Sequence, residues 1–79
     1  MQLEIISPEK PIYKGDIKLI QLPGSDGSFE ILEKHAPLIS TLADGKIKVI
    51  TLEGEVSFFD IQSGVVEIQN NKIMVLVEE

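Results

Sequence analysis

The sequence contains no cysteine, no arginine and no tryptophan, and its only histidine is His35. Without cysteine the chain can form neither a disulfide framework nor a Cys-based metal site, and one histidine excludes multi-histidine zinc or iron sites. Thirteen acidic residues outnumber seven basic ones, all lysine, and the formal charge is −6. Nucleic-acid binding requires clustered cations, preferably arginine, together with exposed aromatic side chains. The composition therefore argues against a nucleic-acid partner.

Long apolar runs and targeting signals are also absent. No stretch approaches the roughly 18 apolar residues of a transmembrane helix, and residues 1–10 lack the basic start and apolar core of a signal peptide. We therefore expect a protein of a reducing compartment that does not insert into a membrane. With 79 residues, 43% hydrophobic and 25% charged, the composition predicts one folded domain, residues 1–79.

The residues that are abundant favour β-structure. Ile, Val and Thr are common and alanine is rare, and β-branched side chains lose rotamer freedom in a helix. Apolar and polar residues alternate around Leu3, Ile47 and Val66, which is the pattern of strands with one face on a core. No helix is convincing, and turn signals recur at short intervals. They are residues 23–27, residues 35–37, Asp44-Gly45, Glu53-Gly54, Ser63-Gly64 and Asn70-Asn71. The sequence predicts an all-β fold, a small antiparallel β-sandwich of about eight to ten short strands.

Three segments break the alternation. The alternation of apolar and polar residues shifts by one position after Leu19 and again at Phe58-Phe59. The segment 72–77 is apolar on both faces. A β-bulge re-aims side chains in this way, and so does a strand that is covered on both faces. In so small a domain, segments that are apolar on both faces belong to the core more often than to an interface. The three segments together nevertheless favour a sheet face that docks onto a partner, so a binding module is favoured over an enzyme.

The polar segment 24–28 and His35 are the candidates for chemistry. Segment 24–28 is rich in glycine but lacks the Lys-Ser/Thr pair of a phosphate-binding loop. Read as a calcium loop, it has no carboxylate at the first or third ligand position. His35 has no accompanying Gly-x-Ser-x-Gly nucleophile motif. We predict a tight turn at 24–28, a loop histidine at 35, and no catalytic residue, cofactor or metal.

Lys46 supports an alternative. It follows Asp44-Gly45 at a predicted hairpin tip, and the lipoyl and biotinyl carrier domains, which are also small and all-β, present one tip lysine for covalent attachment of a cofactor. Here Gly45 and Ile47 flank the lysine, without the acidic or Met residue that those domains place before it. A carrier domain modified at Lys46 is therefore the second hypothesis.

The run Gly-Ser-Asp-Gly-Ser-Phe-Glu-Ile-Leu-Glu-Lys-His-Ala-Pro-Leu, residues 24–38, resembles the epsilon subunit of F-type ATP synthase. That family carries a Gly-x-x-Gly-x-hydrophobic-Gly-Ile stretch followed by His-Ala-Pro-Leu. The opening Leu-Glu-Ile-Ile-Ser-Pro-Glu and the segments 14–15, 63–68 and 71–76 are similar to it as well. The resemblance therefore covers essentially the whole chain, in order.

The resemblance implies a non-catalytic central-stalk (rotor) subunit. The family's N-terminal domain is a ten-stranded β-sandwich that binds the gamma subunit, contacts the polar loops of the c-ring, and helps to couple ion flow to ATP synthesis. The implied location is peripheral, on the cytoplasmic face of the bacterial plasma membrane. Residues carried over by position are Gly27, Ser28 and Phe29 for the c-ring, and His35, Ala36, Pro37 and Ser40 for gamma.

This sequence departs from the family at three places. Many relatives have an acidic residue where Ser28 stands, and the family usually has glycine where Glu30 stands. Most bacterial members also continue into a C-terminal helical hairpin that can inhibit ATP hydrolysis. The sequence ends at Glu79, so we expect these residues alone to lack hairpin inhibition.

Overall fold

Eight β-strands and no helix make up the fold in the computed structural model, which describes residues 1–79. The strands are β1 (Gln2–Ile6), β2 (Pro11–Gly24), β3 (Gly27–Leu32), β4 (Leu38–Leu42), β5 (Gly45–Thr51), β6 (Val56–Ile61), β7 (Ser63–Gln69) and β8 (Lys72–Glu78). The structure contains no helix that is long and apolar enough to cross a membrane.

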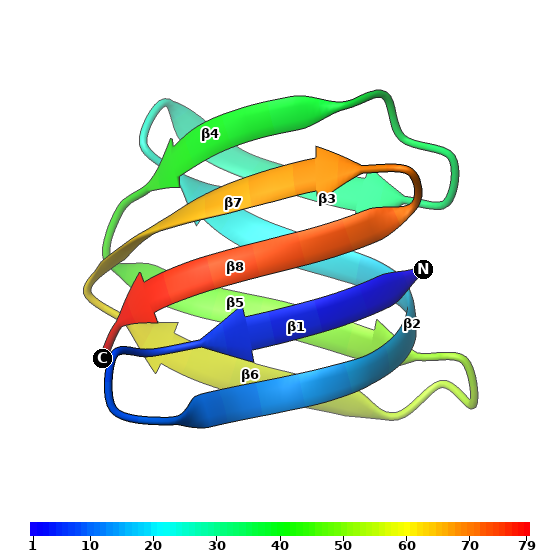
Figure 1. The fold of residues 1–79 in the computed structure, drawn as a ribbon, viewed down its shortest axis with the longest axis horizontal. Coiled ribbons are helices and arrows are strands. Elements are labelled where there is room, and N and C mark those ends of the chain that lie inside the picture. Colours follow the sequence, from blue (N-terminus) through cyan, green and yellow to red (C-terminus); the bar gives the residue numbers. More distant parts are fainter.

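The strands form two facing layers (Figure 1). The first layer contains β4, β7, β8, β1 and the first half of β2, and the second contains β3, the second half of β2, β5 and β6. All pairings are antiparallel except that of β1 with β8, which is parallel. The predicted all-β sandwich is confirmed, with a strand count at the lower end of the expected range.

Strand β2 belongs to both layers. Its 14 residues pair with β1 through Pro11–Asp16 and with β3 and β5 through Ile17–Gly24. A register shift between Ile17 and Leu19 marks a β-bulge at Lys18, which is one of the two explanations that the sequence leaves open for the broken alternation there. The inserted residue leaves Lys18 exposed and Leu19 half-buried between the buried Ile17 and Ile20. Strand β2 continues without interruption through Gly15.

The second phase slip has another cause. Strands β5 and β6 pair in unbroken register across Phe58 and Phe59, so no bulge is present there. Phe59 packs against the core, whereas Phe58 is 58% exposed on the outer face. On β8, likewise, Val75 is buried and Leu76 is 52% exposed. The apolar residues on these outer faces are therefore surface residues.

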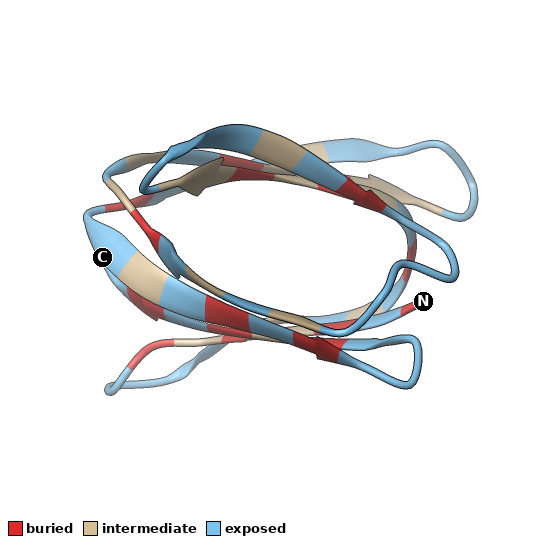
Figure 2. Ribbon diagram, turned by 90° about the horizontal axis from the view of Figure 1, so that it is seen from above, coloured by how far each residue is buried: buried red, intermediate tan, exposed pale blue.

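The core lies between the layers and contains 16 buried hydrophobic residues (Figure 2). They come from inward-facing positions of strands in both layers, with Ile5, Ile20, Val49 and Val75 fully buried. Tyr13 of the first layer and Phe59 of the second meet edge-to-face, with ring centroids 5.8 Å apart. Each strand thus contributes one face to a single shared core, as the alternating pattern predicts.

Candidate partner-binding surfaces

The β2–β3 hairpin is the first group of residues singled out by the sequence. Gly24 and Gly27 pair across it, and Ser25-Asp26 form the turn, as predicted for segment 24–28. A Cβ on Gly24 would lie 2.6 Å from the Gly27 carbonyl oxygen and 2.7 Å from the Phe29 ring, so the backbone approach requires glycine. The Ser25 amide donates to the Thr41 carbonyl at 3.0 Å, which ties the turn to β4.

Gly27, Ser28 and Phe29 differ in their accessibility. Gly27 and Ser28 are exposed, and the Ser28 hydroxyl accepts a 3.4 Å hydrogen bond from the Gln21 side-chain amide. Phe29 is half-buried and packs against the core. A partner that reaches the end of this hairpin therefore meets the backbone of Gly27 and the small hydroxyl of Ser28, while Phe29 fixes the hairpin onto the sandwich.

The loop between β3 and β4 contains the second group. His35, Ala36 and Pro37 are all exposed, and the His35 Nδ1 atom lies 2.8 Å from the Ala36 carbonyl oxygen. Lys34 has a left-handed backbone (φ 64°), and its amide donates to the Asn71 side chain at 3.3 Å. This bond links the loop to the β7–β8 turn. His35 is the loop histidine that the sequence predicts.

Ser40 lies two residues into β4, where it is half-buried and its hydroxyl donates to the Thr41 carbonyl at 3.2 Å. Its neighbour Ile39 is 70% exposed, the highest value among the large hydrophobic residues. The sequence contains a signal for this exposed apolar position, namely the consecutive apolar residues Leu38 and Ile39. Because successive side chains of a strand point to opposite faces, one of the two must lie on the outer face.

The hairpin residues and the loop residues His35, Ala36 and Pro37 lie at opposite ends of β3 (Figure 1), whereas Ser40 lies on β4 next to Thr41, whose carbonyl accepts from the Ser25 amide of the hairpin. A strand rises about 3.3 Å per residue, so the six residues of β3 separate the hairpin from the loop by roughly 20 Å. The structure therefore does not bring Ser28 and His35 into one site. It presents them at two ends of one rigid element, an arrangement that suits two partners better than one.

Lys46 is not at a hairpin tip. It is the second residue of β5, and its ammonium lies 2.8 Å from the Asp60 carboxylate on the neighbouring strand β6. Asp44-Gly45 connects the first layer to the second and does not close a hairpin. The predicted tip position is wrong, and the geometry gives the carrier-domain hypothesis no support.

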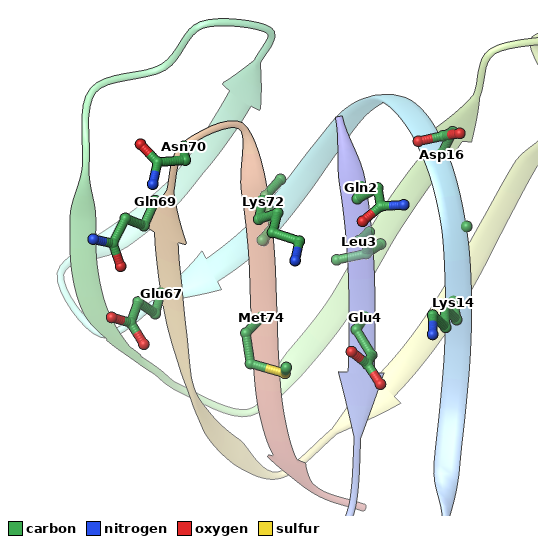
Figure 3. Close-up of a pocket in the computed structure, with 12 residues that line it drawn as sticks. Gln2, Leu3, Glu4, Lys14, Asp16, Glu67, Gln69, Asn70, Lys72 and Met74 are labelled. Atoms are coloured by element: carbon green, nitrogen blue, oxygen red, sulfur yellow. The ribbon is translucent and has the colours of Figure 1, made fainter.

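A shallow concavity of about 360 Å³ lies across the first layer (Figure 3). Its charged residues are of both signs. Two are basic and three are acidic: Lys14, Lys72, Glu4, Asp16 and Glu67. No three His, Cys, Asp or Glu side chains gather there or elsewhere in a metal-binding arrangement. The concavity has neither a dominant charge nor a convergent set of ligands.

Comparison with protein families gives a match along the full length. The family described as "ATP synthase, Delta/Epsilon chain, beta-sandwich domain" matches residues 1–79. ATP synthase epsilon chains from Campylobacter fetus and Leptospira interrogans are 40% and 38% identical over 78 residues, or 99% of this chain. The chain spans about three-fifths of those two relatives (60% and 61%) and 89% of the epsilon chain from Chlorobium limicola, which is 33% identical.

Solved structures agree in fold. A chain in the Euglena gracilis mitochondrial ATP synthase structure described as OSCP/F1/c-ring superposes with a TM-score of 0.91 at 18% identity, covering 98% of this chain and 49% of that one. A chain in the Tetrahymena thermophila mitochondrial ATP synthase structure described as central stalk/c-ring gives 0.84 at 19% identity, covering 99% and 63%. At these identities the likeness concerns the fold alone.

Proposed function

The chain belongs to the delta/epsilon family of ATP synthase, as the family's β-sandwich domain, and from this we propose that it is a central-stalk subunit of an F-type enzyme that binds the gamma subunit and contacts the c-ring. Its part is to help couple ion flow to ATP synthesis without catalysing a step itself. The observation that carries the proposal is the full-length family match at 38–40% identity to epsilon chains.

The placement of the two residue groups supports two simultaneous contacts. We assign Gly27, Ser28 and Phe29 to the c-ring and His35, Ala36, Pro37 and Ser40 to gamma. Because Ser28 and the exposed loop residues His35, Ala36 and Pro37 lie at opposite ends of β3, a partner at one end does not obstruct a partner at the other. Gly27 and Ser28 lie in the paired β2–β3 hairpin, which the Ser25 amide ties to β4, and the loop that contains His35 is tied to the β7–β8 turn through the Lys34 amide and the Asn71 side chain. Little ordering is therefore needed on binding.

The gamma contact extends, in our proposal, onto the outer face of the first layer. Ile39 faces outward two residues after Pro37, whereas Ser40 is on the inward side of β4 opposite the buried Val66. Val65 and Leu76 expose further apolar area on β7 and β8. Val65 and Leu76 are cross-strand neighbours, and their row reaches β4 at Thr41, whereas the direct neighbour of Ile39 on β7 is Glu67. An apolar centre with a polar border is typical of a stable protein interface.

Titration calorimetry with the purified gamma subunit tests the gamma contact. Ile39→Lys should weaken binding at least tenfold, because it places a charge in an apolar interface. Leu52→Lys, at a 56% exposed position in the β5–β6 turn, is the matched control and should bind like the wild type. If the wild-type protein fails to bind gamma, the proposed function is wrong; equal binding by the two variants rejects only the Ile39 surface.

The c-ring contact is tested in the assembled enzyme. Ser28→Lys should lower ATP-driven ion pumping in membrane vesicles relative to ATP hydrolysis, since a large cation would occupy the end of the hairpin. Ser28 is exposed with one 3.4 Å side-chain bond, so the stability of the isolated protein should change by no more than about 0.5 kcal/mol. Normal coupling, or a large loss of stability, would contradict the assignment.

The location we propose is the cytoplasmic face of a bacterial plasma membrane, as a peripheral part of the ATP synthase complex. The relatives of bacterial origin support it. We do not include inhibition of ATP hydrolysis in the role proposed for these residues. In the family a helical hairpin carries out that inhibition, and residues 1–79 contain no helix.

A further inference from the structure

The dipeptide Asp-Gly occurs twice in the chain, in two different structural settings. Of the four aspartates, only Asp26 and Asp44 precede a glycine. Among aspartyl sequences Asp-Gly closes most readily to a succinimide, because no side chain on the second residue obstructs attack by its amide nitrogen. One copy lies in the β2–β3 hairpin turn and the other at the crossing from the first layer to the second. The structure therefore allows the two copies to differ in reactivity.

Asp26 and Gly27 lie at the exposed end of the β2–β3 hairpin. The Asp26 carboxylate forms no hydrogen bond and no ion pair. A Cβ on Gly27 would meet no atom within 4 Å, so the space around its amide is open. Gly24 and Gly27 form the last pair of the ladder, and terminal pairs open at the lowest free energy. The Asp26 carboxyl carbon can thus approach the Gly27 nitrogen without displacing a neighbour.

Asp44 and Gly45 are held in place more firmly. Gly45 is half-buried and is paired with Ile61, which is only 5% exposed. A Cβ on Gly45 would lie 2.9 Å from Pro23 Cβ, and the Ala43 amide donates to the Pro23 carbonyl at 2.8 Å. Closing a ring on the Gly45 nitrogen requires the backbone to rotate here, which would break the pair with Ile61 and the contact with Pro23. The fold therefore protects this copy.

We propose that Asp26-Gly27 is a site of spontaneous isoaspartate formation in the folded protein, and that Asp44-Gly45 is not. The Gly27 amide nitrogen attacks the Asp26 side-chain carboxyl carbon. A C–N bond forms, and the carboxyl hydroxyl leaves with the amide proton as water. Water then adds to the five-membered imide: opening at the α-carbonyl gives isoaspartate, and opening at the side-chain carbonyl restores aspartate. One water is lost and one is gained, so the reaction needs no oxidant or cofactor and leaves the mass unchanged.

Isoaspartate alters the hairpin because the main chain then runs through its side-chain carbon, which adds one backbone atom to a two-residue turn. The turn has little room on its inner side, since a Cβ on Gly24 would already lie 2.6 Å from the Gly27 carbonyl oxygen. Ser25 is tied to Thr41 through its amide at 3.0 Å and its hydroxyl at 2.8 Å. The added atom therefore displaces Gly27 and the start of β3. This chemistry goes beyond the proposed function, because it involves no partner.

Ageing of the purified chain at neutral pH and physiological temperature tests the proposal. The aged protein is digested with trypsin, and isoaspartate in each peptide is measured by methyl transfer from labelled S-adenosylmethionine with an isoaspartyl methyltransferase. Trypsin cleaves after lysine, so the peptide 19–34 contains Asp26 and the peptide 35–46 contains Asp44. Isoaspartate should accumulate at least about tenfold faster in 19–34, which corresponds to about 1.4 kcal/mol in the free energy of opening. Ageing in urea should make the two rates similar, because the dipeptide is the same.

Two variants identify the chemistry. Asp26→Glu should remove the signal from 19–34 and leave 35–46 unchanged, because a six-membered imide closes far more slowly. Asp26→Asn should raise the signal, with ammonia leaving in place of water. Both change one exposed turn residue, and circular dichroism establishes that each variant is folded.

Three results would overturn the proposal. They are no isoaspartate in 19–34 of the folded protein, equal rates in the two peptides of the folded protein, and a difference that persists in urea, which would assign it to the flanking sequence and not to the fold. Neither gamma nor the c-ring is used, so failure here leaves the proposed function untouched.

Discussion

Replacing Gly64 by alanine tests how closely β7 approaches its neighbour β8. A Cβ at this position would lie 2.6 Å from the Leu76 carbonyl oxygen and 3.3 Å from Val77 Cγ1. The first of these atoms belongs to the backbone of a paired strand, so relief requires the two strands to move apart. The position has no left-handed φ, and strain in the dihedral angles therefore does not add to the effect.

The expected loss follows from two opposing effects. Overpacking of this kind costs about 1–3 kcal/mol, and the lower backbone entropy of alanine in the unfolded chain returns about 0.4–1 kcal/mol. The free energy of unfolding of Gly64→Ala should therefore fall by about 1–2 kcal/mol. For a domain of this size each kcal/mol lowers the melting temperature by about 4–8 °C.

Urea unfolding followed by circular dichroism measures the loss directly, and Gly15→Ala is the matched control. A Cβ on Gly15 meets only the Tyr13 ring, with its nearest atom the hydroxyl at 3.3 Å. That side chain can shift by a few tenths of an ångström, so the control should change stability by no more than about 0.5 kcal/mol. Equal stability of the two variants would refute the close-approach argument.

Three further predictions use the same unfolding assay. Ile20→Ala removes a fully buried side chain and should cost about 2–5 kcal/mol, and a smaller loss would mean that the core between the layers closes over the cavity. Asn71 has a left-handed backbone (φ 62°), and its side chain accepts a hydrogen bond from the Lys34 amide. Asn71→Ala should lower the free energy of unfolding by about 1–2 kcal/mol and Asn71→Gly by much less, because glycine adopts this conformation without strain. Equal losses in the two variants would assign the effect to the hydrogen bond. Lys46→Ala should cost less than about 1 kcal/mol, because the pair with Asp60 is solvent-exposed, and a larger loss would contradict this.

Local patterns predicted the parts of the fold that depend on one strand at a time. Alternation around Leu3, Ile47 and Val66 placed these residues in the core, because a strand with one buried face repeats every two residues. The slip after Leu19 indicated the bulge at Lys18. Turn chemistry located Asn70-Asn71, where both residues have positive φ.

Features that depend on pairing between distant segments were not predictable. The parallel pairing of β1 with β8 joins the two ends of the sequence, and no periodicity within either strand encodes it. The sequence predicts a turn at Ser63-Gly64, but these residues lie at the start of β7. There the absence of a Cβ on Gly64 allows β8 to approach closely. The exposed position of Phe58 also follows from the register of β6 on β5, which decides the face of each aromatic residue.

The surfaces were predictable only in part. Ser28 and His35 were found by resemblance, and the structure adds their separation along β3 and the burial of Phe29. The sequence alone does not bring together the outward-facing residues Leu32, Leu19, Ile50 and Val56, because they lie on four different strands and become neighbours only through the sheet.

The passage of β2 through both layers has a mechanical consequence. Most β-sandwich layers are held together by side-chain packing, which resists sliding only through many weak contacts. Here one uninterrupted strand pairs with β1 on one side of its bulge and with β3 and β5 on the other. A torque applied to one layer therefore reaches the other along covalent peptide bonds. With the proposed c-ring contact on the β2–β3 hairpin and the proposed gamma contact on the first layer, load between them would be transmitted through the backbone of β2 and not through the core alone.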